Sequence, residues 1–294
     1  MDQDLDIIAA ETAGFCPGVK TTLERVRELA LAGKSPIYTL GALVHNKQVV
    51  ELLEGKGIRA VASLDEIEGK DGVVVIRAHG IPPEKEAELR ASGFEIVDAT
   101  CPLVKRVHAA IDKRAAEGYT TVIVGDKGHA EVIGLMGYAK GKAFVVSGPE
   151  EAEKLPRIEK ANVVAQTTQE EDVFRRTAEV IERKSGQTVV SDTICKPTRD
   201  RQKETAELAK SVDMMVVIGG KHSANTARLA LLCRRLRPNT VHIESADELD
   251  PEAVAAAGKV GVTAGASTPG WLTDKVVARI KEIRKAASPH HPQS

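Results

Sequence analysis

The sequence predicts an α/β protein made of three similar units with mostly parallel sheets. One observation is that short apolar runs alternate with helical patterns, an order typical of parallel sheets. The other is that three cysteines stand in look-alike contexts, each after a short apolar run and before a helical stretch. These contexts are Glu11-Thr12-Ala13-Gly14-Phe15-Cys16-Pro17, Asp98-Ala99-Thr100-Cys101-Pro102 and Asp192-Thr193-Ile194-Cys195-Lys196-Pro197. Because Cys101 follows Cys16 by 85 residues and Cys195 follows Cys101 by 94, the cysteines mark a repeat.

The repeat predicts the domain organisation. The three α/β units are expected at residues 14–100, 101–194 and 195–287. The third unit lacks a closing strand of its own before a cysteine. We therefore expect the N-terminal strand, within residues 1–13, to pack with the third unit. The polar tail 288–294, which contains His290 and His291, is predicted to be disordered.

Hydrophobic periodicity places the elements of each unit. Apolar residues at helical spacing, such as Val19, Leu23 and Val26, predict a helix after each cysteine. In the first unit we predict helices at 17–32, up to 53 and at 83–91, and strands at 37–40, 59–62, 72–76 and 94–97. In the second we predict helices at 102–116 and 170–184, and strands at 120–124, 143–146, 162–165 and 188–190. In the third we predict helices at 198–211 and 269–285, and strands at 214–218, 240–243 and 260–263, with the N-terminal strand at 5–10.

Composition excludes several classes of partner. Lysine and arginine number 41 against 42 acidic residues, which gives no electrostatic reason to propose nucleic acid or an anionic membrane as a partner. No apolar run approaches the length of a membrane span. The acidic N-terminus lacks the basic and then apolar pattern of a signal peptide, so we expect a cytoplasmic protein.

The three matched cysteines indicate a metal centre. Packing alone does not require the same residue at the same place three times, whereas Cys233 lies on a helical apolar stripe and is expected to be core. Three thiolates suit a zinc ion with an open fourth position. They also suit an iron–sulfur cluster that leaves one iron without a protein thiolate. We favour the cluster, because a structural zinc normally staples local loops rather than distant segments.

Polar loops at the predicted strand ends indicate an anion site. The repeat superimposes the loops around His45, His129 and Ser223, and those around His79, Thr167 and Ser267. Ligands gather at the carboxyl ends of parallel strands, and helix N-termini there favour phosphate groups. If the three units face one axis, one pocket for a phosphate or diphosphate collects His45, His79, His129, Glu131, Thr167, Thr168, Ser223, Asn225 and Ser267. Such Ser, Thr and Asn residues are also common helix caps, a role compatible with ligand binding.

Together these residues resemble the 4-hydroxy-3-methylbut-2-enyl diphosphate reductase family (IspH/LytB). The resemblance runs from residue 14 to 267 in the family's order and covers many separate motifs. They are Gly14-Phe15-Cys16-x-Gly18-Val19, Val44-His45-Asn46, Ala78-His79-Gly80, Asp98-Ala99-Thr100-Cys101-Pro102, His129-x-Glu131-Val132, Gln166-Thr167-Thr168, Ile194-Cys195, Arg201-Gln202, Ser223-x-Asn225 and Gly261-Val262-Thr263-Ala264-Gly265-Ala266-Ser267. Ala224 stands where many members have a second serine, which removes one diphosphate donor.

The resemblance implies a pseudo-threefold trefoil of α/β units around one central [4Fe–4S] cluster per chain, ligated by Cys16, Cys101 and Cys195. It implies reductive dehydroxylation of the allylic diphosphate to isopentenyl and dimethylallyl diphosphates, the last step of the non-mevalonate isoprenoid pathway. Electrons would come from a donor such as a ferredoxin or flavodoxin. The diphosphate contacts carried over are His45, His79, His129, Ser223, Asn225 and Ser267. Glu131 and Thr167 would handle the substrate hydroxyl and proton delivery, and His129 is expected among the catalytic residues as well.

Two alternatives use the same cysteines. The first is a zinc-dependent hydrolase of a phosphorylated metabolite, which would be colourless and hold stoichiometric zinc. The second is a non-catalytic iron–sulfur sensor, against which Glu131 argues, because a sensor needs no acid at that loop.

Overall fold

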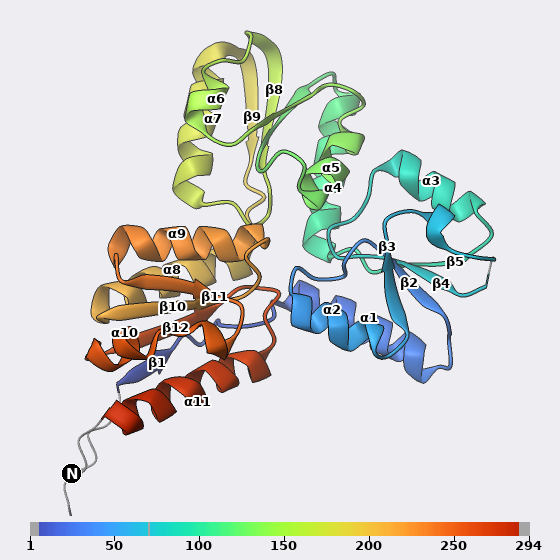
Figure 1. Cartoon of the computed structure of the whole chain (residues 1–294). Helices are drawn as coiled ribbons and strands as arrows, with labels where there is room; N and C mark the ends of the chain where they lie inside the picture. The colour runs from blue at the N-terminus through green and yellow to red at the C-terminus, as the bar shows by residue number, and fades with distance from the viewer. Residues whose placement is uncertain (1–5, 70, 288–294) are drawn as a thin grey trace, which may run out of the picture. The chain divides into compact units, whose positions relative to one another are not determined.

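The computed structural model describes residues 6–69 and 71–287 (Figure 1). The described residues contain three four-stranded parallel sheets flanked by helices, which confirms the predicted α/β class with three similar units. The chain divides into two compact bodies. Body I comprises Met1–Cys16, His45–Lys47 and Asp200–Ser294, and body II comprises Pro17–Val44 and Gln48–Arg199. The predicted boundaries of the three units stay a prediction, and the predicted tail 288–294 lies outside the described residues.

Body I is a three-layer unit around one sheet. The strand order is β1 (Ile7–Ala9), β12 (Val260–Ala264), β10 (Met214–Ile218) and β11 (Thr240–Ile243), with Ile7 opposite Val260. The strand nearest the N-terminus thus pairs with a strand from the end of the chain. The predicted start of that strand, at Leu5, lies outside the described residues.

Helices cover both faces of the body I sheet. Successive side chains of a strand point to opposite faces, and both faces of β10 are apolar. Met214, Val216 and Ile218 pack with the face covered by α10 (Pro251–Ala256) and α11 (Gly270–Ala287). Met215 and Val217 pack with α8 (Lys196–Ser211) and α9 (Ala224–Leu236). Figure 1 shows α9 and α11 on opposite sides of this sheet. A short 3₁₀ helix, Ala246–Glu248, follows β11.

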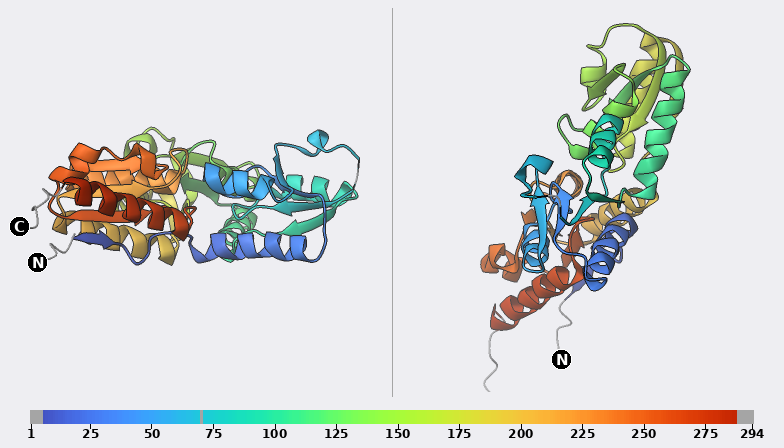
Figure 2. Two further views of the ribbon diagram at one scale, coloured as in Figure 1. Left: turned by 60° about the horizontal axis from the view of Figure 1, so that its bottom comes forward. Right: turned by 90° about the vertical axis from the view of Figure 1, so that its right-hand side faces the viewer.

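Body II contains two sheets of the same strand plan. The first has the order β3 (Ile58–Val61), β2 (Ile37–Leu40), β4 (Val73–Ile76) and β5 (Glu95–Asp98). The second has the order β7 (Ala143–Val146), β6 (Thr120–Val124), β8 (Ile158–Ala165) and β9 (Ser185–Ser191). Their helices are α1 (Pro17–Leu31), α2 (Lys47–Glu54), α3 (Pro83–Ala91), α4 (Pro102–Ala116), α5 (Ala130–Tyr138), α6 (Pro149–Ala152) and α7 (Glu171–Lys184), with a 3₁₀ turn at Leu64–Glu66. Figure 2 shows the same elements from two further directions.

The three sheets correspond strand for strand. In each sheet, the strand that leads to a cysteine is an edge strand with one neighbour: β1 pairs with β12, β5 with β4 and β9 with β8. Because all strands are parallel, their carboxyl ends and the polar loops that follow meet at one edge of each sheet.

Two strands begin earlier than predicted, because their first residues are mostly polar and lack the apolar pattern of a strand. β8 begins at Ile158 rather than 162, and β9 begins at Ser185 rather than 188. A Cβ on Gly186 would lie 2.9 Å from the Glu159 carbonyl oxygen, so the glycine lets the two strands pair closely there. The helix after Cys195 also begins earlier than predicted, at Lys196.

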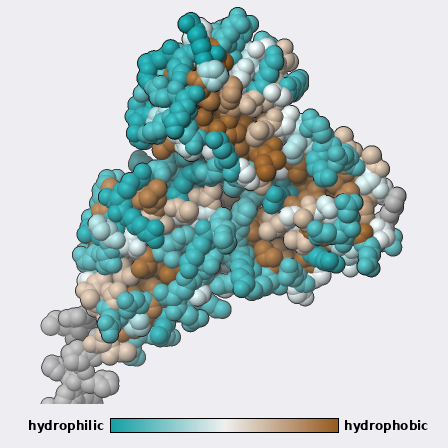
Figure 3. All heavy atoms as spheres, turned by 45° about the horizontal axis from the view of Figure 1, so that its top comes forward, coloured by the Kyte–Doolittle hydropathy of each residue, from teal (hydrophilic) through white to brown (hydrophobic). Residues whose placement is uncertain are grey.

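The surface is mostly hydrophilic in the view of Figure 3. Polar and charged side chains cover much of the face drawn in Figure 3, with separate hydrophobic patches among them. No helix among residues 6–69 and 71–287 has both the length and the apolar character needed to cross a membrane.

Candidate functional site

The three predicted cysteine ligands occupy equivalent backbone positions. Each directly precedes a helix: Cys16 precedes α1, Cys101 precedes α4 and Cys195 precedes α8. Each also donates its backbone N–H to the loop after the neighbouring strand. The acceptors are the carbonyl oxygens of Ala266, Ala78 and Thr167, at 3.1, 3.0 and 3.0 Å. The repeat seen in the sequence therefore has a structural counterpart.

The thiols of these three cysteines suit metal ligation. All three are partly exposed, and the Cys195 sulfur lies 3.0 Å from the Thr198 hydroxyl oxygen. Cys233 is different because it is fully buried in the core beside α8, as predicted, and burial raises the pKa of its thiol to about 12. Each of the three partly exposed thiols is therefore more accessible than the thiol of Cys233.

A buried carboxylate lies in body II. Glu131, in the first turn of α5, is only 2% exposed. Its Oε1 accepts the backbone N–H of Thr167 at 2.6 Å, and its Oε2 accepts the Thr167 hydroxyl at 2.8 Å. Thr167 follows β8, so this pair joins two adjacent strand ends of one sheet. The structure thus brings together the two residues predicted to handle protons.

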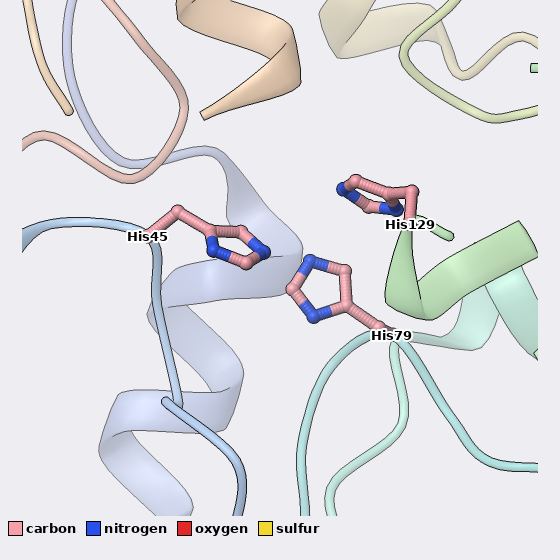
Figure 4. Close-up of side chains that lie close together, drawn as sticks. All are labelled: His45, His79 and His129. Atoms are coloured by element: carbon pink, nitrogen blue, oxygen red, sulfur yellow. The ribbon is translucent and has the colours of Figure 1, made fainter. Parts of the chain in front are cut away.

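Two of the predicted histidines lie beside this pair's helix. His79, after β4, and His129, at the N-terminus of α5, have ring centroids 5.3 Å apart and rings 85° from parallel (Figure 4). The His129 Nδ1 accepts the backbone N–H of Glu131 at 3.2 Å, so His129 caps the helix that carries the carboxylate. His45, also drawn in Figure 4, follows β2 and belongs to body I.

Two close contacts, at Gly137 and at His108, pack the loop after His79 against α5. A Cβ on Gly137 of α5 would lie 2.6 Å from the Pro82 Cβ, so a glycine is needed for this close packing. His108 of α4, 5% exposed, stacks on Tyr138 and lies under Gly80, where an added Cβ would approach its Cε1 to 2.5 Å. The regular spacing of Gly134 and Gly137 on α5 was the available signal for this contact face.

Body I gathers the remaining predicted anion contacts. Ser223 caps α9 and accepts the Thr226 backbone N–H at 3.4 Å, and Asn225 lies in the first turn of that helix. Ser267 follows β12 in the neighbouring loop, and the His45 carbonyl lies 2.4 Å from where a Cβ on Gly220 would stand. Asn225 Nδ2 is buried without a hydrogen-bond partner among the described residues, which suits a group that binds a ligand.

Each body therefore holds part of the predicted site at the carboxyl ends of its strands. Body I holds Cys16, His45, Ser223, Asn225 and Ser267. Body II holds Cys101, Cys195, His79, His129, Glu131, Thr167 and Thr168.

Comparison with known proteins identifies the family. Residues 7–281 match the model of the LytB protein family. The chain belongs to this family. A relative from Geotalea uraniireducens, named 4-hydroxy-3-methylbut-2-enyl diphosphate reductase, is 45% identical over 281 residues, which are 96% of this chain and 99% of that protein. A relative of the same name from Aquifex aeolicus is 44% identical over 282 residues, covering 95% of this chain and 97% of that protein.

Solved structures of LytB-type reductases agree with the fold. One, described as (E)-4-hydroxy-3-methyl-but-2-enyl diphosphate reductase, the terminal enzyme of the non-mevalonate pathway, is 44% identical with a TM-score of 0.70. It covers 95% of this chain and 99% of its own. The E-1-hydroxy-2-methyl-but-2-enyl-4-diphosphate reductase of Plasmodium falciparum is 29% identical with a TM-score of 0.86, covering 92% of this chain and 86% of its own. The resemblance read from the motifs is thereby confirmed.

Proposed function

We propose that this LytB family member converts (E)-4-hydroxy-3-methylbut-2-enyl diphosphate to isopentenyl diphosphate and dimethylallyl diphosphate by reductive dehydroxylation. This is the last step of the non-mevalonate pathway. The near full-length match to reductases of that name carries the proposal. The buried Glu131–Thr167 pair supports it, since an acid held beside a hydroxyl suits proton delivery to a leaving group.

Cys16, Cys101 and Cys195 would hold one [4Fe–4S] cluster per chain. The support is their equivalent placement before three helices and their partial exposure. A bound cluster would supply electrons to the substrate. A donor such as a ferredoxin or flavodoxin would supply those electrons to the cluster. The cytoplasm is the compartment we propose, since it keeps such thiols reduced.

The reaction balances with two electrons and two protons. The carbon–oxygen bond of the substrate breaks, one proton accompanies the departing hydroxide to give water, and the second proton goes to the allylic carbon. Hydroxide is a poor leaving group, so its departure needs a positioned acid. Glu131 is the acid we assign to this step. Thr167 holds the Glu131 carboxylate through both of its oxygens. We assign the Thr167 hydroxyl to the contact with the substrate hydroxyl.

Diphosphate binding is the role we propose for hydrogen-bonding side chains in the loops that follow the strands. We assign it to His45, His79, His129, Thr168, Ser223, Asn225 and Ser267. Serine hydroxyls and amide N–H groups at helix N-termini are suited to phosphate oxygens. The buried Nδ2 of Asn225, with no partner among the described residues, supports its place in this set.

Metal and sulfide analysis of anaerobically purified protein separates this proposal from its rival. The reductase requires brown protein with about four iron and four sulfide ions per chain and a visible spectrum that changes when the substrate is added. Colourless protein with one zinc ion would overturn the proposal and would favour a zinc-dependent hydrolase, which three thiolates and an open position also fit. An iron-loaded protein that turns over no allylic diphosphate would instead be a sensor.

A further inference from the structure

The loop that carries Cys16 is longer than the other two cysteine loops. In the Cys101 loop, the backbone N–H of Ala99 still donates to Ile76 of β4 at 2.9 Å, so only Thr100 separates the last sheet bond from the cysteine. In the Cys16 loop, the last such bond is from Ala10 to Val262, at 2.8 Å. Five residues, 11–15, then lead to Cys16, and a segment of that length needs other bonds to hold one conformation.

The residue two positions before each cysteine is held by hydrogen bonds, but the groups that make these bonds differ among the three loops. Thr193, before Cys195, uses its own hydroxyl, which accepts the Ala165 N–H at 2.8 Å and donates to the Ala165 carbonyl at 2.7 Å. Ala99, before Cys101, uses the backbone bond to Ile76. Gly14, before Cys16, has no side chain, and its φ of +107° is a conformation that favours glycine.

Arg201 of α8 supplies the missing tie to Gly14. Arg201 is 3% exposed, its Nη2 donates to the Gly14 carbonyl at 2.8 Å, and its Nη1 donates to the carbonyl of Ala264. Ala264 ends β12 as Ala165 ends β8, so Arg201 makes for the Cys16 loop the connection that Thr193 makes within its own loop. A planar guanidinium can bridge two acceptors in fixed directions, which a lysine cannot do.

Glu204 fixes the beginning of the same loop. One turn along α8, its carboxylate accepts the Glu11 N–H at 2.6 Å, the Thr12 N–H at 2.9 Å and the Thr12 hydroxyl at 2.5 Å. Burial raises the pKa of Glu204, but the bonds from Thr12 and Glu11 outweigh it and lower the pKa below its usual value. Arg201 and Glu204 lie three residues apart on one helix face, so together they hold both halves of the loop.

The Cys101 loop provides an internal comparison. Thr22 of α1 stands six residues after Cys16, as Arg201 stands six after Cys195. Its hydroxyl lies 3.1 Å from the carbonyl oxygen of Ala99, two residues before Cys101, and 2.9 Å from the Gly18 carbonyl oxygen within α1, so the two acceptors share one proton. In both cases a side chain at the sixth position after one cysteine contacts the loop of another.

We propose that Arg201, assisted by Glu204, is a positioning residue that holds Cys16 in the conformation required of a cluster ligand. The ligand role of Cys16 rests on the proposed function, but the tie between α8 and the loop does not. The two parts are therefore tested by different measurements.

Hydrogen exchange of the full-length chain tests the tie without iron or turnover. In Arg201→Gln, we expect amides of residues 11–16 to exchange at least about tenfold faster, with residues 99–101 unchanged, because charged hydrogen bonds that close the loop are lost. In Thr22→Val, we expect faster exchange of the amides of residues 99–101, with residues 11–16 unchanged. Lys203→Gln, which removes an exposed cation from the same helix, should change neither segment.

The ligand role is read from iron release by a chelator in the loaded enzyme. Arg201→Gln should release iron about tenfold faster than wild type, Arg201→Lys should fall between them, and Lys203→Gln should match wild type. If Arg201→Gln does not fold, Glu204→Gln takes its place with the same expected direction.

Unchanged exchange at residues 11–16, or equal acceleration throughout the chain, would overturn the tie. Faster local exchange with unaltered iron release would overturn the positioning role. Wild-type protein without iron would refute the proposed function while leaving the exchange result valid.

Discussion

Replacing Glu131 by glutamine separates the chemical role of its carboxylate from its structural role. The side chain is 2% exposed, and its two oxygens accept two hydrogen bonds from Thr167. Glutamine has the same shape and keeps one acceptor oxygen, while its amide can donate to the Thr167 hydroxyl oxygen. Losing a charged acceptor costs about 1–3 kcal/mol of folding free energy, which an ordinary domain tolerates. We therefore expect Glu131→Gln to fold and to retain its iron.

Turnover should respond far more strongly than stability. A positioned acid contributes about 10²–10⁴-fold to a rate, and glutamine cannot deliver a proton. The assay is anaerobic consumption of the allylic diphosphate with a chemical reductant, together with iron content and a substrate-binding spectrum. Glu150→Gln is the matched control, because Glu150 is an exposed acid at the same second position of a helix, α6. Turnover of Glu131→Gln within about threefold of wild type would refute the assigned role.

Three further predictions concern the thiols, a buried histidine and a packed glycine. Single serine substitutions at Cys16, Cys101 and Cys195 should each lower bound iron, measured by metal analysis, whereas Cys233→Ala should not. Burial lowers the pKa of His108 to about 4, so the unfolded chain takes up a proton between pH 6.5 and 4 that the folded chain does not. Stability should therefore fall as pH falls through that window, by about 3 kcal/mol in total, and His108→Phe should remove this slope in denaturant titrations. Gly137→Ala should lower the unfolding midpoint, because overpacking against Pro82 costs about 1–3 kcal/mol and exceeds the roughly 1 kcal/mol gained in helix propensity. Gly270→Ala is the control and should not lower the midpoint, because a Cβ at Gly270 would meet no atom within 4 Å.

Much of the fold was predictable because its signals are local. The central strands β4 and β10 are short runs of Val, Ile and Met, at 73–76 and 214–218, and buried parallel strands need no polar alternation. The three cysteine contexts marked the repeat, and the equivalent backbone bonds of Cys16, Cys101 and Cys195 give that repeat a structural basis. The extra length of β8 and β9 was missed, because Gly186 and its polar neighbours do not look like a strand.

The candidate site was predictable where a loop follows a strand, and less so where contacts cross the sequence. Glu131 and Thr167 are 36 residues apart, yet both follow adjacent strands of one sheet, so topology alone predicts that they approach each other. The bond from Arg201 to Gly14 spans 187 residues. It depends on which face of α8 packs against β12, and no spacing in the sequence specifies that choice. The motif around Arg201 indicated a resemblance, but only the contacts assign it a role.

Product analysis with defined electron input tests the central claim most directly. Anaerobic protein is given (E)-4-hydroxy-3-methylbut-2-enyl diphosphate and a known amount of reductant, and products are separated by chromatography. We expect isopentenyl and dimethylallyl diphosphates with their diphosphate groups intact, formed with consumption of two electrons per molecule. Release of inorganic phosphate or of the free alcohol without electron consumption would contradict it, because hydrolysis needs no reductant.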